Sequence, residues 1–278
     1  MKLTVIVENK AMNALVRRAH GLSLYLETGT HTVLFDFGPR GELLLSNAAA
    51  LGLDLKKVDI AVLSHGHNDH SGGLEAFLEW NKTAKVYIHR RAFVPHFARA
   101  GESWNNISAD PALPERYAGR IVWTEGVYAI DSTLTLFSEV PERVPMFSTN
   151  RTLFEQGEDS DYVPDQFSHE QSLLVQDGET LSLLGGCAHR GITNILSRAI
   201  EVAGRTPDAV FAGFHTTNPG LGVDEDTGVI LRAGDTLRRW KCLYYTGHCT
   251  GDGPYALLQT VLGDSMAYLG CGNSYHVD

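Results

Sequence analysis

The chain has 278 residues, 43% of them hydrophobic, and a formal net charge of −10. This length permits one large domain or two small ones, and the hydrophobic share is sufficient for a substantial core. The negative charge argues against a protein that binds nucleic acid, which needs an excess of lysine and arginine to neutralise phosphates.

The sequence also argues against a membrane or secreted protein. No hydrophobic run approaches the length of a membrane span, and the run that begins at Met1 is interrupted at Glu8. The four cysteines form no Cys-x-x-Cys pair, so we expect them to be reduced and not to build a disulfide framework. We therefore predict a soluble cytoplasmic protein that acts on a small-molecule substrate and binds neither nucleic acid nor membrane.

The first third of the chain alternates short hydrophobic segments with turns, which predicts strands around one helix. The expected strands are residues 3–7, 22–27, 32–37 and 58–63, and the expected helix is 43–51. This order is typical of one half of a layered sandwich.

The fourth expected strand leads directly into Ser-His-Gly-His-Asn-Asp-His, residues 64–70. Imidazole nitrogen and carboxylate oxygen are ligands that zinc accepts and that iron or manganese tolerate. If the strand continues through His65 and His67, its period of two places both rings on one side. The following turn can then bring Asp69 and His70 round to face them. The run therefore predicts most of two adjacent metal positions.

The middle of the chain is less regular. A helix is expected at 74–80, a strand at 85–89 and a hairpin at 126–140. Residues 93–120 lack clean periodicity, and residues 141–168 are acidic and contain prolines. We interpret both as insertions, the first over the site and the second as a long covering loop, because loops commonly carry specificity.

The second half alternates strands and helices. The strands are expected at 172–176, 181–184, 209–214 and 243–245, and the helices at 192–203, 229–240 and 255–262. Sheets covered by helices on their outer faces predict an αββα sandwich, of the α/β class or α+β by some schemes, with residues 1–278 as one domain. A third insertion, residues 216–228, could cradle an anion through its backbone amides, although its acidic residues favour a surface turn.

Five further candidate donors stand at the ends of expected strands in this half. They are His169, Cys187, His189, His215 and His248. A strand that ends near a glycine and then presents a donor directs it into the crevice at the sheet edge, where ligands of such folds collect. A lone strand-end histidine is more often a surface or capping residue, so each candidate needs a second line of evidence.

The spacing His65-x-His67-x-Asp69-His70 after a buried strand resembles the signature of the metallo-β-lactamase superfamily. The resemblance implies two divalent metal ions, with zinc expected and iron or manganese as alternatives. It gives His65 and His67 to the first metal, and Asp69 and His70 to the second. An upstream aspartate at a strand end, here Asp36, is implied to orient a ligand loop.

The resemblance also addresses the ligands from the second half. Tyr-Tyr-Thr-Gly-His, residues 244–248, resembles the last histidine motif of the superfamily and gives His248 to the second metal. For the middle position, one alignment takes His169 as the third histidine and Cys187 as a bridging donor, as in β-lactamases that use cysteine there. A second alignment takes His189 as the ligand with Cys187 as its close neighbour, and we favour it.

The second alignment rests on a narrower resemblance. Several blocks are similar to members of the 7,8-dihydropterin-6-methyl-4-(β-D-ribofuranosyl)aminobenzene 5'-phosphate synthase-like subfamily, and they span nearly the whole chain. These blocks are residues 64–74, 170–173, 186–195, 212–215 and 247–251. In this alignment His215 orients a ligand or faces the substrate.

The implied function is a dinuclear metal-dependent hydrolase, or a lyase or transferase with the same centre. A metal-activated water would attack a small, phosphorylated or pterin-like molecule. Asp69 would bind metal and orient the hydroxide, and His215 or Tyr245 would stabilise developing oxyanion charge. Arg190, at a helix start, could pair with a phosphate or carboxylate of the substrate, or be a solvated arginine. The alternatives are an iron-dependent redox enzyme of the same fold and a non-catalytic metal-containing protein that binds a metabolite.

Overall fold

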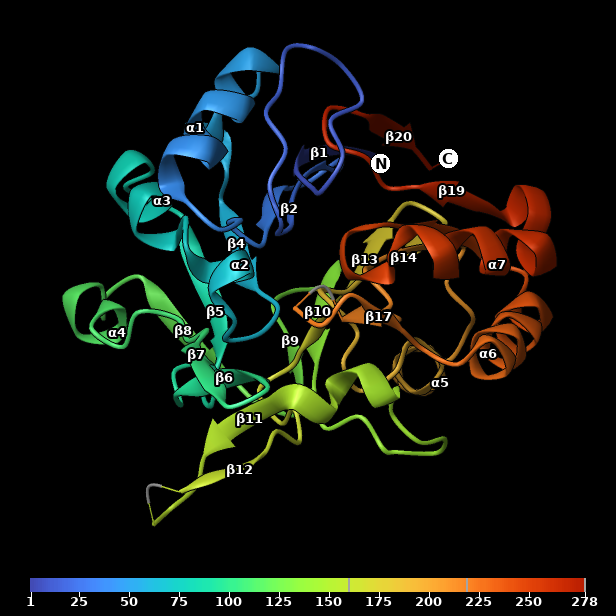
Figure 1. Ribbon diagram of the computed structural model, residues 1–278. Coiled ribbons are helices and arrows are strands. Elements are labelled where there is room, and N and C mark those ends of the chain that lie inside the picture. The colour runs from blue at the N-terminus through green and yellow to red at the C-terminus, as the bar shows by residue number, and fades with distance from the viewer. Residues whose placement is uncertain (160, 219, 278) are drawn as a thin grey trace.

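Two seven-stranded sheets pack face to face at the centre of the structure, a computed structural model that describes residues 1–159, 161–218 and 220–277 (Figure 1). The first sheet, in spatial order, contains β20 (Ser274–His276), β1 (Lys2–Val7), β2 (Ser23–Glu27), β3 (Thr32–Phe35), β4 (Ile60–Leu63), β5 (Lys85–His89) and β8 (Ile121–Thr124). The second contains β19 (Met266–Tyr268), β18 (Leu243–Thr246), β15 (Ala209–Phe211), β14 (Thr180–Leu184), β13 (Ser172–Asp177), β10 (Leu134–Phe137) and β9 (Val127–Ala129).

Both sheets are mixed, and their parallel parts determine where the candidate donors lie. β3, β4, β5 and β8 are parallel neighbours in the first sheet, as are β14, β15, β18 and β19 in the second. The carboxyl ends of parallel strands share one sheet edge. The segments that follow β4, β14, β15 and β18 carry all of the candidate donors except His169, which precedes β13, so these segments meet at one end of the sandwich.

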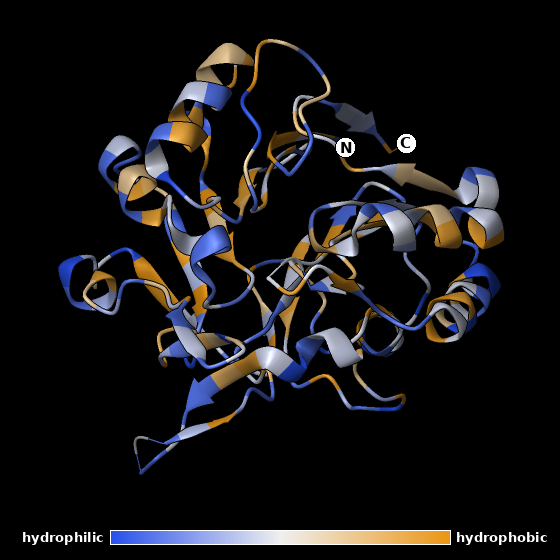
Figure 2. Ribbon diagram, in the orientation of Figure 1, coloured by the Kyte–Doolittle hydropathy of each residue, from blue (hydrophilic) through white to orange (hydrophobic). Residues whose placement is uncertain are grey.

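The core has three hydrophobic layers, which follow from the alternation of side chains along each strand. In β3, Val33 and Phe35 pack between the two sheets, whereas Leu34 points outward and packs under the helices. Figure 2 shows hydrophobic residues concentrated along the central strands and on the helix faces that cover them. Because both faces of each sheet are covered, the central strands are hydrophobic along nearly their whole length.

Helices cover the outer face of each sheet (Figure 1). The longer ones are α1 (Gly41–Ala50) and α3 (Leu74–Trp80) on the first sheet, and α5 (Ile192–Ala203), α6 (Thr227–Trp240) and α7 (Asp252–Leu262) on the second. In α5, Ile192, Ile195, Leu196 and Ala199 are buried at helical spacing, and Gly204 ends the helix with a φ of 71°. The expected αββα sandwich is therefore confirmed.

The two central insertions differ from the sequence-based expectation. Instead of a long covering loop, residues 141–168 contribute β11 (Leu153–Gln156) and β12 (Tyr162–Pro164), and residues 93–120 contribute β6 (His96–Ala100) and β7 (Ser103–Asn106). These strands form a separate sheet in the order β12-β11-β6-β7, which we call the roof sheet. The pairing of β6 with β11 joins distant segments, so local periodicity did not reveal it.

The remaining elements are short. They are α2 (Asn68–Ser71), α4 (Leu113–Arg116), η1 (Leu55–Lys57), η2 (Ser148–Thr152), η3 (His248–Thr250), η4 (Gly263–Ser265) and the strands β16 (Thr217–Asn218) and β17 (Val223–Asp224). The last two form a hairpin within the third expected insertion, residues 216–228. β19 and β20, which complete the two sheets near the C-terminus, were not predicted from the sequence.

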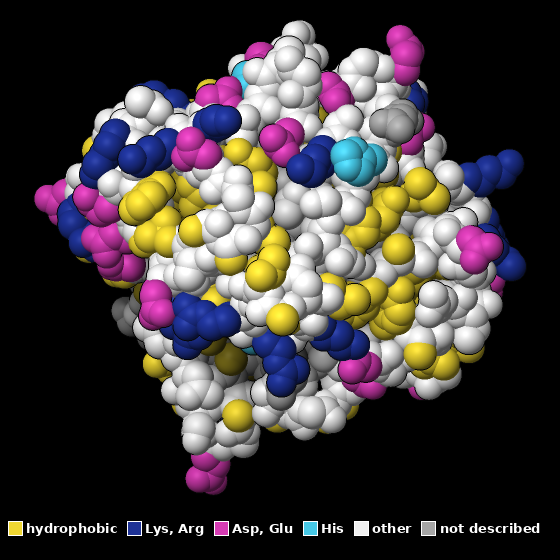
Figure 3. Space-filling view, turned by 90° about the horizontal axis from the view of Figure 1, so that it is seen from above, with side chains coloured by type: hydrophobic (Ala, Val, Ile, Leu, Met, Phe, Trp, Pro, Cys, Tyr) yellow, Lys and Arg dark blue, Asp and Glu magenta, His cyan; other side chains and the backbone are white. Residues whose placement is uncertain are grey.

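Acidic and basic side chains are both spread over the face of the molecule shown in Figure 3. Among the described residues, every helix is too short or too polar to cross a membrane.

Candidate metal centre

The motif of residues 64–70 begins where β4 ends and is held by Asp36, which directly follows β3. Ser64 donates two hydrogen bonds to the Asp36 carboxylate, one from its N–H and one from Oγ, each 2.7 Å long. Asp36 has a φ of 62°, and β3 and β4 are parallel neighbours, so its carboxylate reaches the start of the motif at the shared sheet edge. Asp36 therefore lies where the sequence analysis expected it.

His65, His67 and His189 form the first donor set, with one nitrogen of each within 4.8 Å of the others and all three side chains buried. Ser64 Oγ gives its own hydrogen to a carboxylate, so it accepts a bond of 2.8 Å from His65 Nδ1. Asn150 Oδ1 accepts a bond of 2.9 Å from His189 Nδ1. Both rings are therefore protonated at Nδ1, and their buried Nε2 lone pairs have no hydrogen-bond partner.

His67 contributes to the first donor set in a different orientation. Its buried Nε2 also lacks a hydrogen-bond partner among the described residues, but the Asp165 carboxylate lies 3.9 Å from it, and this negative charge favours the proton on Nε2 and a free lone pair on Nδ1. Burial lowers the pKa of His65 and of His189, and neighbouring imidazoles lower both values further. Neutral imidazole is the form that binds a metal.

Asp69, His70, Cys187 and His248 form the second donor set, with their donor atoms within 4.8 Å of one another. His70 Nε2 lies 3.2 Å from both Cys187 Sγ and His248 Nε2. Asp69 Oδ2 lies 3.5 Å from the same nitrogen of His70 and 3.3 Å from that of His248. Four donors of three chemical types therefore converge on one point.

Each of the two histidines of the second donor set has an oxygen acceptor at its Nδ1, the ring nitrogen that does not belong to the donor set. His70 Nδ1 lies 2.7 Å from Asp36 Oδ2, and His248 Nδ1 lies 3.0 Å from Asn9 Oδ1. Burial opposes protonation of His70, but the charges of Asp69 and Asp36 raise its pKa to about 9. The same negative charges would stabilise a divalent cation.

Both donor sets fit divalent metal ions. Imidazole, carboxylate and thiolate are ligands of zinc, and the same ligands hold iron. Hydrogen bonding from behind the ring to an oxygen acceptor is typical of histidines that ligate a metal. Metal binding would also account for the buried Nε2 atoms of His65 and His189, because buried polar atoms rarely lack a partner.

The structure places His189 and Cys187 in the donor sets and His169 outside both. The Gly66 N–H donates to His169 Nδ1 over 3.0 Å, so the proton of this neutral ring is on Nε2. His169 Nε2 in turn donates to Asp165 Oδ2 over 3.1 Å. Hydrogen bonds therefore engage both nitrogens of His169, and this residue supports the backbone of the segment 64–70.

A tight turn after β14 presents Cys187 and His189. Ala188 between them has a φ of 54°, and Glu170 accepts hydrogen bonds from the His189 N–H at 2.7 Å and the Arg190 N–H at 2.9 Å. Burial raises the pKa of Glu170 to about 7, although these two N–H groups act in the opposite direction. Glu170 was not among the predicted site residues, because its role depends on backbone donors nineteen and twenty positions away.

His215 lies beside the first donor set without belonging to it. Its ring centroid is 4.2 Å from that of His189, and neither of its ring nitrogens has a hydrogen-bond partner. Its backbone is fixed on both sides, because its N–H donates to Cys249 Sγ at 3.3 Å and its carbonyl accepts from Thr149 Oγ1 at 2.5 Å. One of its ring nitrogens also lies within 4.8 Å of the sulfurs of Cys187 and Cys249.

A cavity of about 180 Å³ lies over both donor sets. Its lining includes members of both sets and His215, and the remaining wall comes from the insertions. The roof sheet supplies Ala98, Ala100, Asn105 and Leu153, and the hairpin of β16 and β17 supplies Asn218 and Gly220. The three segments that the sequence analysis interpreted as insertions therefore all contribute to the wall of one cavity.

His20 also lines the cavity and was not predicted. Its Nε2 lies 3.4 Å from Asp69 Oδ2, and its ring centroid is 4.6 Å from that of His248. It lies in the loop between β1 and β2, outside any motif, so no local signal in the sequence identified it.

Arg190 and Tyr245 are not among the described residues that line this cavity, which differs from their expected contact with substrate. The Arg190 guanidinium donates to the carbonyl oxygens of Val140 at 2.8 Å and Gln166 at 3.0 Å. Tyr245 stacks on Phe211 between the two sheets, with ring centroids 4.5 Å apart. Its position on β18 directs the ring into the sandwich and away from the strand end.

Comparisons with known proteins agree with this architecture. A family model described as the metallo-beta-lactamase superfamily matches residues 16–270. The chain is 28% identical over 247 residues to the 7,8-dihydropterin-6-methyl-4-(beta-D-ribofuranosyl)-aminobenzene-5'-phosphate synthase of Methanocaldococcus jannaschii, covering 84% of this chain and 81% of the synthase.

Two solved structures share the fold. Tm1679, described as a metal-dependent hydrolase of the beta-lactamase superfamily, superposes with a TM-score of 0.81 at 24% identity, covering 100% of this chain and 99% of its own. The metallo-beta-lactamase fold protein YhfI from Bacillus subtilis superposes with a TM-score of 0.54 at 12% identity, covering 99% of this chain and 98% of its own.

Proposed function

Because the chain belongs to the metallo-β-lactamase superfamily, we propose that it is a dinuclear metal-dependent hydrolase of a small molecule. The observation that carries this proposal is the convergence of the two donor sets on the floor of one cavity. Two divalent ions bound there would act as Lewis acids and lower the pKa of a water molecule, which allows hydrolysis without a protein nucleophile.

The residues of the chain itself would bind and orient the substrate. His215 presents two unpartnered ring nitrogens beside the first donor set, where one of them can donate a hydrogen bond to an oxygen that gains negative charge. Asp69 belongs to the second donor set, and its carboxylate can also accept a hydrogen bond from a water molecule and orient it. The Asn105 and Asn218 amides line the cavity wall and offer further polar contacts.

We propose a phosphorylated or pterin-like substrate, by extension from the Methanocaldococcus synthase, whose name describes a pterin-bearing 5'-phosphate product. The cavity contributes little cationic charge of its own. Arg99 is the one arginine or lysine among the described lining residues, and its guanidinium is 5.4 Å from the ring of its cross-strand partner Trp104. Ala98 also lines the cavity, and successive side chains of a strand point to opposite faces of the sheet. The Arg99 side chain therefore points to the other face of the sheet from the Ala98 side chain. An anionic group would therefore be bound mainly by the metal ions.

The proposal is tested with protein purified without added ions. Metal analysis should find two ions per chain, and hydrolysis of a panel of phosphate esters and lactones should stop on chelation and return on adding one divalent metal. His67→Ala should abolish tight binding of the first ion and turnover, whereas the exposed His276→Ala should change neither. Hydrolysis that persists after chelation, or in His67→Ala, would contradict the proposal. Colour and oxygen sensitivity would instead indicate iron-dependent redox chemistry.

A further inference from the structure

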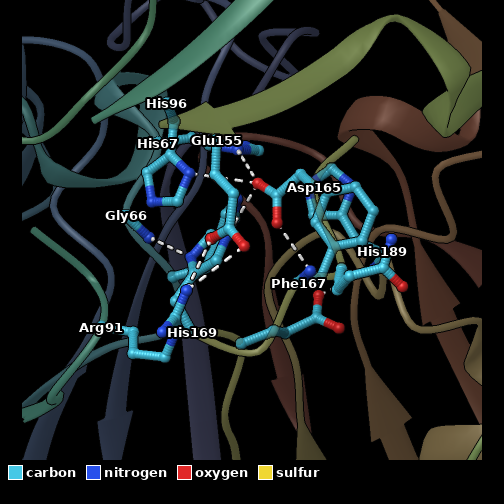
Figure 4. Close-up of polar contacts among 12 residues, drawn as sticks. Gly66, His67, Arg91, His96, Glu155, Asp165, Phe167, His169 and His189 are labelled. Atoms are coloured by element: carbon cyan, nitrogen blue, oxygen red, sulfur yellow. Dashed lines mark hydrogen bonds and ion pairs between the residues drawn. The ribbon is translucent and has the colours of Figure 1, made fainter. Parts of the chain in front are cut away.

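A second polar cluster, centred on Asp165, lies beside His67 of the first donor set (Figure 4). Asp165 Oδ2 is 3.1 Å from His96 Nδ1, 3.1 Å from His169 Nε2 and 3.9 Å from His67 Nε2. Its other oxygen accepts a hydrogen bond of 2.6 Å from the Phe167 N–H. All three imidazoles and the carboxylate are buried. One carboxylate thus contacts a residue of the first donor set and two histidines that belong to neither set.

The four side chains are close enough to hold a cation, but their hydrogen bonds favour a different interpretation. The Gly66 N–H occupies the lone pair of His169 Nδ1, so His169 Nε2 is protonated and donates to Asp165. A protonated nitrogen cannot ligate a metal. The cluster is therefore a set of hydrogen bonds that converge on a buried carboxylate, and not a third metal position.

The charge of Asp165 influences which nitrogen of His67 carries the proton. Among the described residues, His67 Nε2 has no hydrogen-bond partner, and the Asp165 carboxylate, at 3.9 Å, is beyond hydrogen-bond distance. The charge of this buried carboxylate nevertheless favours the tautomer with its proton at Nε2, which leaves the Nδ1 lone pair for a metal. His65 and His189 are protonated at Nδ1 by contrast, because their oxygen acceptors lie at that nitrogen. His67 is thus the member of the first donor set whose tautomer depends on Asp165.

The same carboxylate joins the roof of the cavity to its floor. His96 is the first residue of β6 in the roof sheet, and Asp165 directly follows β12 of that sheet. On the floor, His169 holds the backbone of Gly66, which stands between two residues of the first donor set. Gly66 must be glycine here, because a Cβ would lie 2.0 Å from the Ala92 carbonyl oxygen.

From this geometry we propose that Asp165 is a positioning residue for the first metal. It fixes the tautomer and ring orientation of His67 and, through His96 and His169, couples the roof sheet to the loop that carries the ligands. This inference rests on the proposed function, since it assigns a role around the first of its two ions. Occupation of the first donor set should therefore rigidify the roof sheet, although no roof-sheet residue belongs to either donor set.

The test compares Asp165→Asn with wild type and with Asp159→Asn, an exposed acid that carries the same change of charge. Zinc affinity is measured by competition with a chromophoric chelator. We expect Asp165→Asn to lower the affinity for one of the two ions by about tenfold to a hundredfold and to leave the affinity for the other unchanged. Hydrogen exchange of residues 96–106 should slow on zinc binding in wild type and slow less in Asp165→Asn. If Asp165 had a merely structural role, the substitution would lower the affinity for both ions together or for neither.

His96→Gln provides a second variant that retains the carboxylate, and it should weaken the same ion to a smaller extent. If Asp165→Asn does not fold, His96→Gln takes its place in the comparison. Wild type that binds two ions, with unchanged affinities in the variants, would overturn this inference and leave the proposed function intact. Wild type that binds three ions would also overturn it, because the cluster would then be a metal position. Wild type that binds none would contradict the proposed function and this inference together.

Discussion

Cys187 and His189 are separated by one residue, yet their side chains belong to different donor sets. Cys187 Sγ lies 3.2 Å from His70 Nε2, whereas His189 joins the first donor set. Residues two apart on a regular strand point to the same side. Ala188 between them has a φ of 54°, and this left-handed residue turns the chain so that one short segment contributes to both donor sets.

Cys187→Ser should therefore selectively lower the affinity for the ion at the second donor set. A hydroxyl is a poorer ligand than a thiolate for zinc or cobalt, so we expect a loss of affinity of about tenfold or more at one ion. Cobalt-substituted protein should also lose its sulfur-to-metal charge-transfer absorption. Cys242→Ser removes a thiol that lies in the core under the helices and should leave both properties unchanged. Equal absorption in the Cys187 variant and wild type would show that this sulfur does not bind the metal.

His189→Ala and His169→Ala distinguish the two alignments of the middle ligand. His189→Ala removes a nitrogen that faces the first donor set and should reduce the bound metal from two ions to one. His169→Ala removes the support for Gly66 and one hydrogen bond to Asp165, but no donor-set nitrogen, and should retain two ions with weaker binding of one. The measurement is metal content after dialysis against a weak chelator. The opposite ranking of the two variants would favour His169 as the ligand.

His215→Ala should separate metal binding from turnover. The ring belongs to neither donor set, so two ions should remain bound. Loss of a hydrogen-bond donor to developing charge typically lowers kcat by about 10²–10³. The measurement is kcat together with metal content in the same preparation. A normal kcat would remove His215 from the reaction, and loss of an ion would make it a ligand.

His31 should make folding stability depend on pH. Partial burial disfavours its charge, but hydrogen bonds and charges from Asp59 and Asp131 raise its pKa above 6.5. Protonation therefore favours the folded state, and this contribution is complete below the unfolded pKa and disappears as pH rises through the folded one. Urea unfolding of wild type and His31→Gln should differ at about pH 6 and converge at about pH 9. A difference that grows with pH would contradict this assignment.

Local patterns in the sequence predicted the parts of the structure that local forces determine. The central strands, the long helices and the motif of residues 64–70 depend on periodicity and on turns within a few residues. The choice between His169 and His189 depends on the Gly66 hydrogen bond and on the φ of Ala188, and neither is encoded in a spacing. The roof sheet was missed because β6 and β11 acquire their strand conformation by pairing with each other.

The two substrate contacts proposed from the sequence were limited in the same way. Arg190 was proposed as a substrate contact because it lies at a helix start, but its guanidinium donates hydrogen bonds to two backbone carbonyls. Tyr245 was expected to stabilise oxyanion charge, but the alternation of the strand directs its ring between the sheets. His20 reaches the cavity from a loop far away in the chain, which only the folded structure brings close.

Anomalous diffraction from crystals soaked with zinc tests the central claim most directly. We expect two zinc peaks, one ligated by His65, His67 through Nδ1, and His189, and the other by Asp69, His70, Cys187 and His248. A peak ligated by His169 or His96, or the absence of metal from either donor set at saturating zinc, would contradict it.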